Sequence, residues 1–399
     1  MSHPALRFLA LPLLIWAAVL GIVRVTVAPA ELCGDGSPDA FRDTAQDAAN
    51  WLKANQFEDG SYVYIYDREQ DAYPNEYNIV RHAGVTMSLY QVAGRLGDRA
   101  AFEAAERGTA YLLDQMHYHD DWGGPVEGGD IKVGTAALMT IALAERRLLT
   151  GEDTYDDVMR DLGRFMLAQQ KPDGGFYTKW FVDSQEMDLV STSAYYPGEA
   201  LWALAMLHEA FPDEGWDEAA WRAADFVTLL RDEVENVPYP PLNDHWAAYG
   251  MAEMVEWGLA DHHIDYARRL AGRFSLFIRF EAQKTDEGLN LLIRGDSRSS
   301  SALGTWVEGM AALWRLAESD PRMAGMGDDI RAQAACGADL LVQRQAEDDR
   351  PPTEAGAWFI HGVTRMDDQQ HAISGLLYTA DALEGRVKRE PDVPAAVAR

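Results

Sequence analysis

The residues of this sequence that could carry chemistry lie at the polar heads of six otherwise apolar segments. The clearest case is the segment 193–207, which opens with Tyr195, Tyr196 and Glu199 and continues through small and apolar residues. A helix that is apolar on nearly every side has to be buried on nearly every side. We therefore expect its apolar part inside a large core and its polar head at the edge of a pocket.

Four carboxylates at these heads are candidate catalytic groups: Asp130, Glu199, Asp244 and Glu308. Glycoside hydrolysis needs one protonated carboxyl group and one that acts as base or nucleophile. Glu199 and Glu308 fall in the first turns of nearly uncharged segments, where burial would raise the pKa of a carboxyl group toward that of a general acid. Acidic residues at a helix start also complement the helix dipole, and Asp130 and Asp244 fall at N-cap positions. Capping and catalysis therefore both stay open.

The same heads carry aromatic, basic and imidazole groups that suit a sugar. Sugar hydroxyls need polar partners, and the apolar faces of a sugar ring stack on indole or phenol rings. The candidate substrate-binding residues are Tyr77, Arg81, His82, Tyr195, Tyr196, His245, Trp246, Tyr249, Arg298, Trp306, Arg365 and His371.

A second mechanism would use a tyrosine or a histidine in place of the carboxylates. Proton abstraction beside a uronate carboxylate, as in lyases and epimerases, needs a base and a group that neutralises the acid. Tyr195, Tyr196 or His245 would supply the base, and an arginine such as Arg81 would neutralise the acid. Packing against the start of a buried helix is the alternative role for the tyrosine pair.

The sequence motifs give no support to metal or cofactor chemistry. His117 and His119 alternate in a presumed loop, and His262 and His263 are adjacent, but neither pair has the spacing of a zinc site with two further ligands. The sequence has no phosphate loop, dinucleotide fingerprint or Gly-x-Ser-x-Gly elbow. We expect neither a metal nor a cofactor.

Helical periodicity shows how the heads are positioned, because two kinds of segment alternate from residue 41 onward. Amphipathic, charged segments cover about 41–55, 100–116, 154–170, 217–233, 264–282 and 327–345. Apolar segments rich in small residues cover about 78–95, 131–148, 194–210, 245–257, 302–317 and 370–383. The alternation predicts twelve helices in six hairpins.

A recurrent turn supports this pairing. Several amphipathic segments end in a glutamine followed by an acidic, glycine-containing turn, at Gln56, Gln115 and Gln170 and more weakly at Gln283 and Gln345. The spacing is about 57 residues, longer than the ~34 residues of common two-helix repeats. Each apolar segment also has a glycine near its head, which costs about 1 kcal/mol against alanine in a helix and so indicates close packing. The apolar helices would form an inner ring and the amphipathic helices an outer ring.

This pattern resembles the six-hairpin (α/α)6 toroid families over about residues 41–384. Those families include unsaturated glucuronyl hydrolases, N-acylglucosamine 2-epimerases and the C-terminal domain of glucuronate C5-epimerases. The Gln-x-x-Asp-Gly-Gly-Phe form of 170–176 is also similar to repeats of squalene cyclases, but the Asp-x-Asp-Asp acid of such cyclases is missing from this sequence. The resemblance implies the fold, and it carries over no family's catalytic residues.

The composition limits the kinds of partner that the protein can bind. The chain has 399 residues and a formal net charge of −29, with 64 acidic and 35 basic residues. Nucleic acids need a basic footprint on the protein, so we expect no nucleic-acid partner. The length allows one large domain.

The N-terminus departs from this composition. An apolar run, 8–23, follows Arg7 and precedes the small-residue site 28–30, which is the pattern of a secretory signal. The run also approaches the length of a membrane span, so an uncleaved anchor is the alternative. Both interpretations predict an exported protein, periplasmic or extracellular, with membrane association through this segment alone. In that compartment Cys33 and Cys336 could form a disulfide or stay as two thiols.

We therefore predict an all-α protein with an N-terminal signal or anchor at 1–30, a linker at 31–40, an (α/α)6 toroid at 41–384 and a flexible tail at 385–399. The predicted function is a glycoside hydrolase that acts on a saccharide at the mouth of the inner helices. The alternatives are a uronate epimerase or lyase, and a toroid that only binds a glycan or a protein in an envelope assembly.

Overall fold

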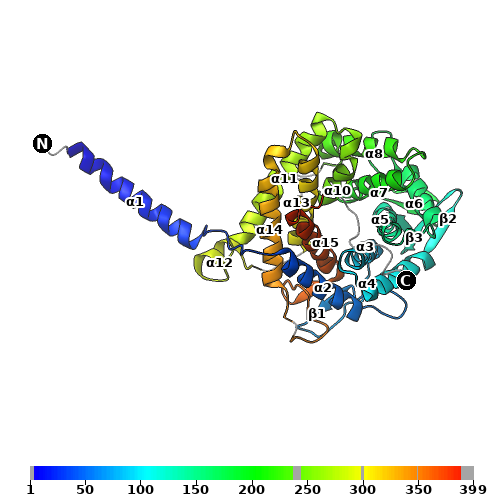
Figure 1. Cartoon of the computed structure of the whole chain (residues 1–399), viewed down its shortest axis with the longest axis horizontal. Coiled ribbons are helices and arrows are strands. Elements are labelled where there is room, and N and C mark those ends of the chain that lie inside the picture. The colour runs from blue at the N-terminus through cyan, green and yellow to red at the C-terminus, as the bar shows by residue number, and fades with distance from the viewer. Residues whose placement is uncertain (1–3, 237–243, 298–300, 348, 388–399) are drawn as a thin grey trace.

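A closed ring of six helices forms the centre of the protein. The computed structural model describes residues 4–236, 244–297, 301–347 and 349–387. The inner helices are α3 (Ile79–Leu96), α5 (Val133–Thr150), α7 (Tyr196–Ala210), α10 (His245–Glu253), α13 (Ser301–Ser319) and α15 (Met366–Leu383). Each contacts the next, and α15 contacts α3 and so closes the ring (Figure 1). Residues 197–207 of α7 are all buried, as expected for a helix apolar on every side.

A second set of helices surrounds the ring. These outer helices are α2 (Pro38–Ala54), α4 (Arg99–Asp114), α6 (Asp156–Gln169), α8 (Trp216–Asp225), α11 (Asp261–Ala282) and α14 (Gly327–Arg344). The end of α8 continues through the π-helical turn η1 (Phe226–Leu230) into α9 (Arg231–Val234), and α10 continues into the 3-10 turn η2 (Met254–Trp257). A further 3-10 turn, η3 (Ala324–Met326), precedes α14. The predicted alternation of amphipathic and apolar helices is confirmed.

The repeated glutamine turn joins neighbouring hairpins. The side-chain amide of Gln56 donates hydrogen bonds to the carbonyls of Gly60 (3.1 Å) and of Ala104 on the next outer helix (2.9 Å). Arg107 of that helix donates back to Gln56 Oε1 at 2.7 Å. Gly60 has φ +90, and a Cβ there would lie 2.2 Å from the Arg107 carbonyl oxygen, so only glycine fits. The repeated glutamine turn in the sequence therefore corresponds to a contact between neighbouring hairpins.

The same contact recurs around the ring. Gln170 donates to the carbonyl of Ala219 at 2.9 Å and accepts from Arg222 at 2.6 Å. At the end of the chain, Gln345 donates to the carbonyl of Thr44 at 2.9 Å. Because Thr44 lies on α2, this last turn joins the final hairpin to the first outer helix.

Seven short strands form in the longer links, where the sequence predicted only loops. β1 (Ile65–Asp67) pairs with β7 (Val363–Arg365) in antiparallel register. The strands β2 (Met116–His119), β3 (Trp122–Glu127), β4 (Asp130–Lys132), β5 (Lys179–Phe181) and β6 (Glu186–Met187) form one antiparallel sheet in that order. The links that enter successive inner helices lie side by side, so their backbone groups satisfy one another. β4 and β7 lead directly into α5 and α15 and so fix the heads of those helices.

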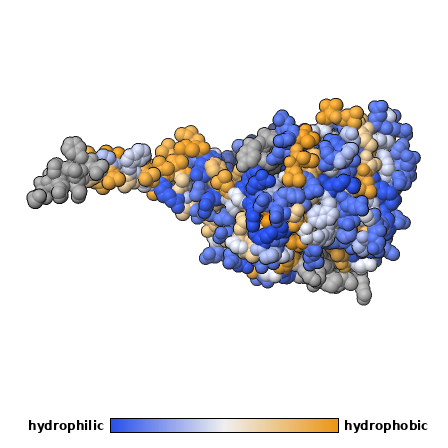
Figure 2. Space-filling model, turned by 90° about the horizontal axis from the view of Figure 1, so that it is seen from above, coloured by the Kyte–Doolittle hydropathy of each residue, from blue (hydrophilic) through white to orange (hydrophobic). Residues whose placement is uncertain are grey.

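The N-terminal helix α1 (Pro4–Thr26) extends away from the ring, and its exposed apolar surface is clear in Figure 2. It contacts the short helix α12 (Gly288–Arg294), and both Asn290 and Arg294 donate to the carbonyl of Val27. Within the residues whose side chains the structure describes, no helix combines the length and apolarity that a membrane crossing requires.

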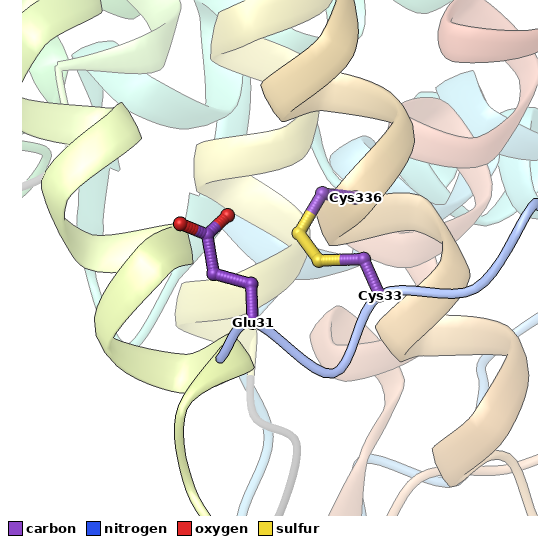
Figure 3. A group of neighbouring side chains, drawn as sticks. All are labelled: Glu31, Cys33 and Cys336. Carbon is purple, nitrogen blue, oxygen red and sulfur yellow. A yellow bond between two sulfur atoms is a disulfide. The ribbon is translucent and has the colours of Figure 1, made fainter. Parts of the chain in front are cut away.

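A disulfide fastens the segment after α1 to the ring. Cys33 bonds to Cys336 of α14, so the disulfide expectation is met and two separate thiols are excluded in this structure (Figure 3). Nearby, Glu31 accepts a hydrogen bond from Arg279 at 2.6 Å, and the Leu32 N–H donates to the Ala282 carbonyl at 2.8 Å. Pro38 already begins α2, so the helical part starts inside the predicted linker 31–40. Of the predicted tail, 388–399 lies outside the described residues.

Candidate active site

A cavity of about 450 Å³ lies at the N-terminal heads of the inner helices. All six inner helices or the residues just before them contribute to its wall. The lining residues are Asn78, Val80, Arg81, Leu138, Ser193, Tyr195, Tyr196, Glu199, His245, Trp246, Ala302, Thr305, Arg365, Asp367, Gln370 and His371. The prediction that polar heads converge on one mouth agrees with this lining, and the size suits a small ligand.

Two histidines of the wall share one carboxylate oxygen of Glu308. His371 Nδ1 lies 2.6 Å from Glu308 Oε1, and His245 Nε2 lies 3.0 Å from the same oxygen. Tyr249 donates a hydrogen bond to the other oxygen, Oε2, at 3.2 Å. Glu308 comes from α13, where it is fully buried behind the cavity wall. It therefore cannot touch a ligand directly, and it positions the two imidazoles that can.

Burial sets the protonation of this cluster. It raises the pKa of Glu308 well above its usual value and lowers the pKa of His371 well below 6.5. Neighbouring positive groups, including Arg81 and Arg365, lower the pKa of His371 further. The imidazole of His371 is therefore neutral near pH 7, which is the state a general base needs.

His245, Glu308 and His371 offer one metal-ligand atom each, and these atoms all lie within 4.8 Å of one another. Two ligands of a zinc-like ion, each about 2.0–2.2 Å from it, lie more than 3 Å apart in tetrahedral geometry. The 2.6 Å contact between His371 and Glu308 is that of a hydrogen bond and leaves no room for an ion between these atoms. The geometry is that of an acid–base cluster.

Glu199 is the one predicted catalytic carboxylate on the cavity wall. It stands in the first turn of α7, and burial raises its pKa to about 8. Tyr196 is at the head of the same helix, and its pKa is raised by burial and by the nearby Glu199 carboxyl. Both side chains face Gly134 of α5, where any larger residue would meet them within 2.5 Å.

Two arginines hold a second acidic residue of the wall. Arg81 Nε lies 3.1 Å from Asp367 Oδ2, and Arg365 Nε lies 3.7 Å from Asp367 Oδ1. Arg81 also donates to the hydroxyl of Tyr64. About a third of each arginine side chain is exposed, so both guanidinium groups can still reach a ligand.

Aromatic side chains complete the wall. Trp246 packs against His245, with ring centroids 4.2 Å apart, and lies 5.7 Å from the ring of His371. Tyr195 is largely exposed at the rim. Trp246 is only 3% exposed, so the ring of Tyr195 at the rim is the more accessible aromatic surface.

Asp130 and Asp244 do not line the cavity. Asp130 lies 3.2 Å from Lys179, in the sheet of the links. Asp244 is buried against Arg231 at 2.6 Å and accepts a hydrogen bond from Tyr266. No side-chain cap forms at Asp244, so the expected N-cap hydrogen bond is missing. These two carboxylates are held away from the cavity by their cations.

Two other predicted binding residues form a buried support behind the wall. His82 donates from Nε2 to the carbonyl of Gly108 at 2.8 Å, and its Nδ1 accepts from Tyr77 at 2.6 Å. The Tyr77 hydroxyl in turn accepts from the Tyr62 N–H at 3.1 Å. Burial lowers the pKa of His82 to about 4. These hydrogen bonds occupy both ring nitrogens of His82 within the protein.

The remaining predicted residues divide into supporting and undescribed groups. Tyr249 supports Glu308, and Trp306 packs on Phe277 with ring centroids 4.9 Å apart, so neither lines the cavity. Arg298 lies outside the described residues. The sequence-based selection missed Asp367 and Gln370. The signal for Asp367 was its place beside Arg365 at a helix head, whereas nothing in the sequence distinguished Gln370.

Comparisons with known proteins define the fold. The sequence matches no family model and no curated protein. Similar solved structures include an unsaturated glucuronyl hydrolase specific for heparin, with TM-score 0.61 and 13% identity over 88% of this chain and 99% of that chain. A cellobiose 2-epimerase from Spirochaeta thermophila has TM-score 0.61 and 13% identity over 87% and 98%. A D-mannose isomerase has TM-score 0.59 and 12% identity over 87% and 97%.

These matches confirm the predicted (α/α)6 toroid fold. The similar proteins process carbohydrates, by hydrolysis in one case and by epimerisation or isomerisation in the others. At 12–13% identity the likeness concerns the fold, and the choice between these reactions has to come from the site.

Proposed function

We propose that the protein is a sugar isomerase or epimerase that moves a proton at the carbon next to a carbonyl group. The observation that carries this proposal is the pair of cavity-lining imidazoles at one oxygen of the buried Glu308: His371 Nδ1 is hydrogen-bonded to it at 2.6 Å, and His245 Nε2 lies 3.0 Å from it. A histidine oriented by a buried carboxylate is a recurrent arrangement for acid–base catalysis. An unsaturated glucuronyl hydrolase, a cellobiose 2-epimerase and a D-mannose isomerase share the fold, so the choice of reaction rests on this histidine pair.

His371 is the better base of the two. Its side chain is 12% exposed, against 1% for His245. When Nδ1 donates to Glu308, Nε2 is left with a lone pair that can take the proton from the sugar carbon. The electron pair of the broken C–H bond moves to the carbonyl oxygen and gives an enediolate. The step starts from the ionised carboxylate of Glu308, which is hydrogen-bonded to His371 and Tyr249. Because burial raises its pKa, this carboxylate can take the Nδ1 proton, so the negative charge passes to the enediolate and the imidazole stays neutral.

The placement of the two rings favours isomerisation. Their centroids are 5.1 Å apart, so both belong to one wall of the cavity. In isomerisation, the hydroxyl proton on the second enediolate oxygen passes to the former carbonyl oxygen, and the second oxygen becomes the new carbonyl. The base returns its proton to the neighbouring carbon on the same face, which interconverts an aldose and a ketose. Epimerisation inverts one carbon and needs proton delivery from the opposite face, or an intermediate that turns over in the cavity.

Deuterium exchange tests the proposal directly. The purified protein is incubated in D2O with a panel of aldohexoses, ketohexoses and reducing disaccharides. We expect deuterium at the carbon next to the carbonyl group together with a new aldose or ketose, both read by NMR. His371→Ala should slow exchange by about 10²–10⁴, the usual contribution of a general base. The control is His262→Ala, because His262 does not line the cavity. Cleavage of oligosaccharides with no deuterium incorporation from any sugar would contradict the proposal.

A second candidate function is glycoside hydrolysis with Glu199 as the general acid. Its raised pKa and its place on the wall favour this reaction. The second carboxylate of such a mechanism would have to be Asp367, which is engaged by Arg81 and Arg365. The other three predicted carboxylates do not line the cavity. For this reason the histidine mechanism is the first proposal.

We also propose that the protein acts outside the cytoplasm, with α1 as its leader or anchor. The disulfide between Cys33 and Cys336 supports this location, because such bonds persist in oxidising compartments. Thiol titration of the denatured protein from its native cells should find no free thiol. Two titratable thiols in freshly prepared protein would overturn this location.

A further inference from the structure

Glu199 lines the cavity and has an unsatisfied carboxyl oxygen at its base. The residue is 4% exposed and lines the cavity. Among the residues that the structure describes, its buried Oε2 has no hydrogen-bond partner. This oxygen packs closely against Gly134 of α5, where a Cβ would lie only 2.5 Å from it. An unpaired polar atom in a core costs about 1–3 kcal/mol, so its retention at a cavity points to a ligand.

The surroundings of Glu199 keep its carboxyl group neutral. The titratable groups of the cavity and its nearby wall are Arg81, Glu127, Asp130, Tyr195, Tyr196, His245, Arg365, Asp367 and His371. The charge of Arg81 is engaged by Asp367 at 3.1 Å, and Asp130 faces Lys179. Burial is the cause of the raised pKa of Glu199, which is about 8. At pH 7 the side chain therefore carries an O–H group that can donate a hydrogen bond.

We infer that Glu199 binds the carbonyl oxygen of the sugar as a neutral carboxylic acid and stabilises the negative charge that forms there. This inference rests on the proposed proton transfer. In that step the sugar C–H proton goes to His371 Nε2, and the electron pair moves to the carbonyl oxygen. The Glu199 O–H donates to this oxygen throughout, and no bond of Glu199 breaks. A hydrogen-bond donor fixed at a developing oxyanion contributes about 10²–10³ in rate.

Two substitutions separate hydrogen-bond donation from proton donation. Glu199→Gln keeps a neutral N–H donor of the same size, whereas Glu199→Ala removes the donor. In the deuterium-exchange assay at pH 7 we expect the glutamine variant within about tenfold of wild type and the alanine variant slower by about 10²–10³. The wild-type rate should fall above pH 8 as the carboxyl group ionises. The glutamine variant should show no such fall.

The controls make failure interpretable. Melting temperatures of both variants establish that they fold, and an infrared difference spectrum between wild type and Glu199→Gln at pH 6 should contain the carbonyl band of a protonated acid. Folded glutamine and alanine variants that are equally inactive would overturn the inference, as would a missing acid band. Failure of the proposed function has a different signature, because wild type itself would then exchange no deuterium.

Discussion

Two buried carboxylates beside the cavity show how partners decide the role of an acid. Asp244 and Glu308 are 1% and 0% exposed; Asp244 is the N-cap residue of α10, and Glu308 is the eighth residue of α13. Asp244 meets Arg231, a cation that cannot release its proton, and the pair forms a fixed link between α9 and α10. Glu308 meets two histidines that line the cavity and can gain or lose a proton. Equal burial therefore gives a structural ion pair in one place and, in the mechanism that we propose, a proton relay in the other.

The largest expected effect is on stability, from Asp244→Ala. The substitution leaves the Arg231 guanidinium buried without its carboxylate, and breaking such a pair typically costs about 3–5 kcal/mol. Urea unfolding measures the loss, and the activity of the folded fraction should stay near wild type. Unchanged stability with lost activity would place Asp244 in the chemistry and remove the contrast with Glu308.

The corresponding substitution at the second buried carboxylate is Glu308→Gln. The amide keeps the shape of the side chain but cannot take a proton from His371, so we expect exchange activity to fall about 10²-fold. The free energy of unfolding should change by about 1 kcal/mol or less, because no charge is stranded. Activity near wild type would show that the imidazoles work without the carboxylate.

A pH profile sharpens the same contrast. His371 must be neutral to accept a proton, and burial lowers its pKa well below 6.5. The acid limb of kcat/KM should therefore lie below pH 6.5, and activity should be lost only as the pH falls through that lower value. An acid limb at or above 6.5 would indicate that His371 is not the base.

The smallest effect is expected from Tyr249→Phe. This change removes one hydrogen bond to Glu308 Oε2 and leaves both imidazole contacts in place. A net value of about 0.5–1.5 kcal/mol for such a bond corresponds to a twofold to tenfold decrease in exchange rate. A decrease as large as that of Glu308→Gln would make Tyr249 an equal member of the relay.

The ring could be predicted from the sequence because its signals are local. The 3.6-residue periodicity, the polar heads and the glutamine turns all lie within single segments, and the structure places Gln56 and Gln170 at equivalent inter-hairpin contacts. Two strand pairings, β1 with β7 and β4 with β5, could not be predicted locally because they join different links. β1 and β7, for example, pair residues about 300 positions apart.

The site was predicted only in part, because its geometry depends on pairing between distant side chains. Glu199, His245 and His371 were recognised at helix heads, and all three line the cavity. Nothing in the sequence shows that Asp244 meets Arg231 while Glu308 meets His371, 63 positions away. The choice between capping, ion pairing and catalysis was therefore open for each carboxylate until the partners were known.

The closure of the ring has a consequence for synthesis of the protein. The helix α15 closes the inner ring between α13 and α3, and it also carries His371. While the chain leaves the ribosome, every earlier hairpin exposes an apolar edge, because its last neighbour has not yet been made. Such long-range closure slows folding and leaves intermediates prone to aggregation. The proposed base, His371, lies on the helix that is made last and closes the ring. A chain terminated before α15 would therefore lack both a closed ring and this base.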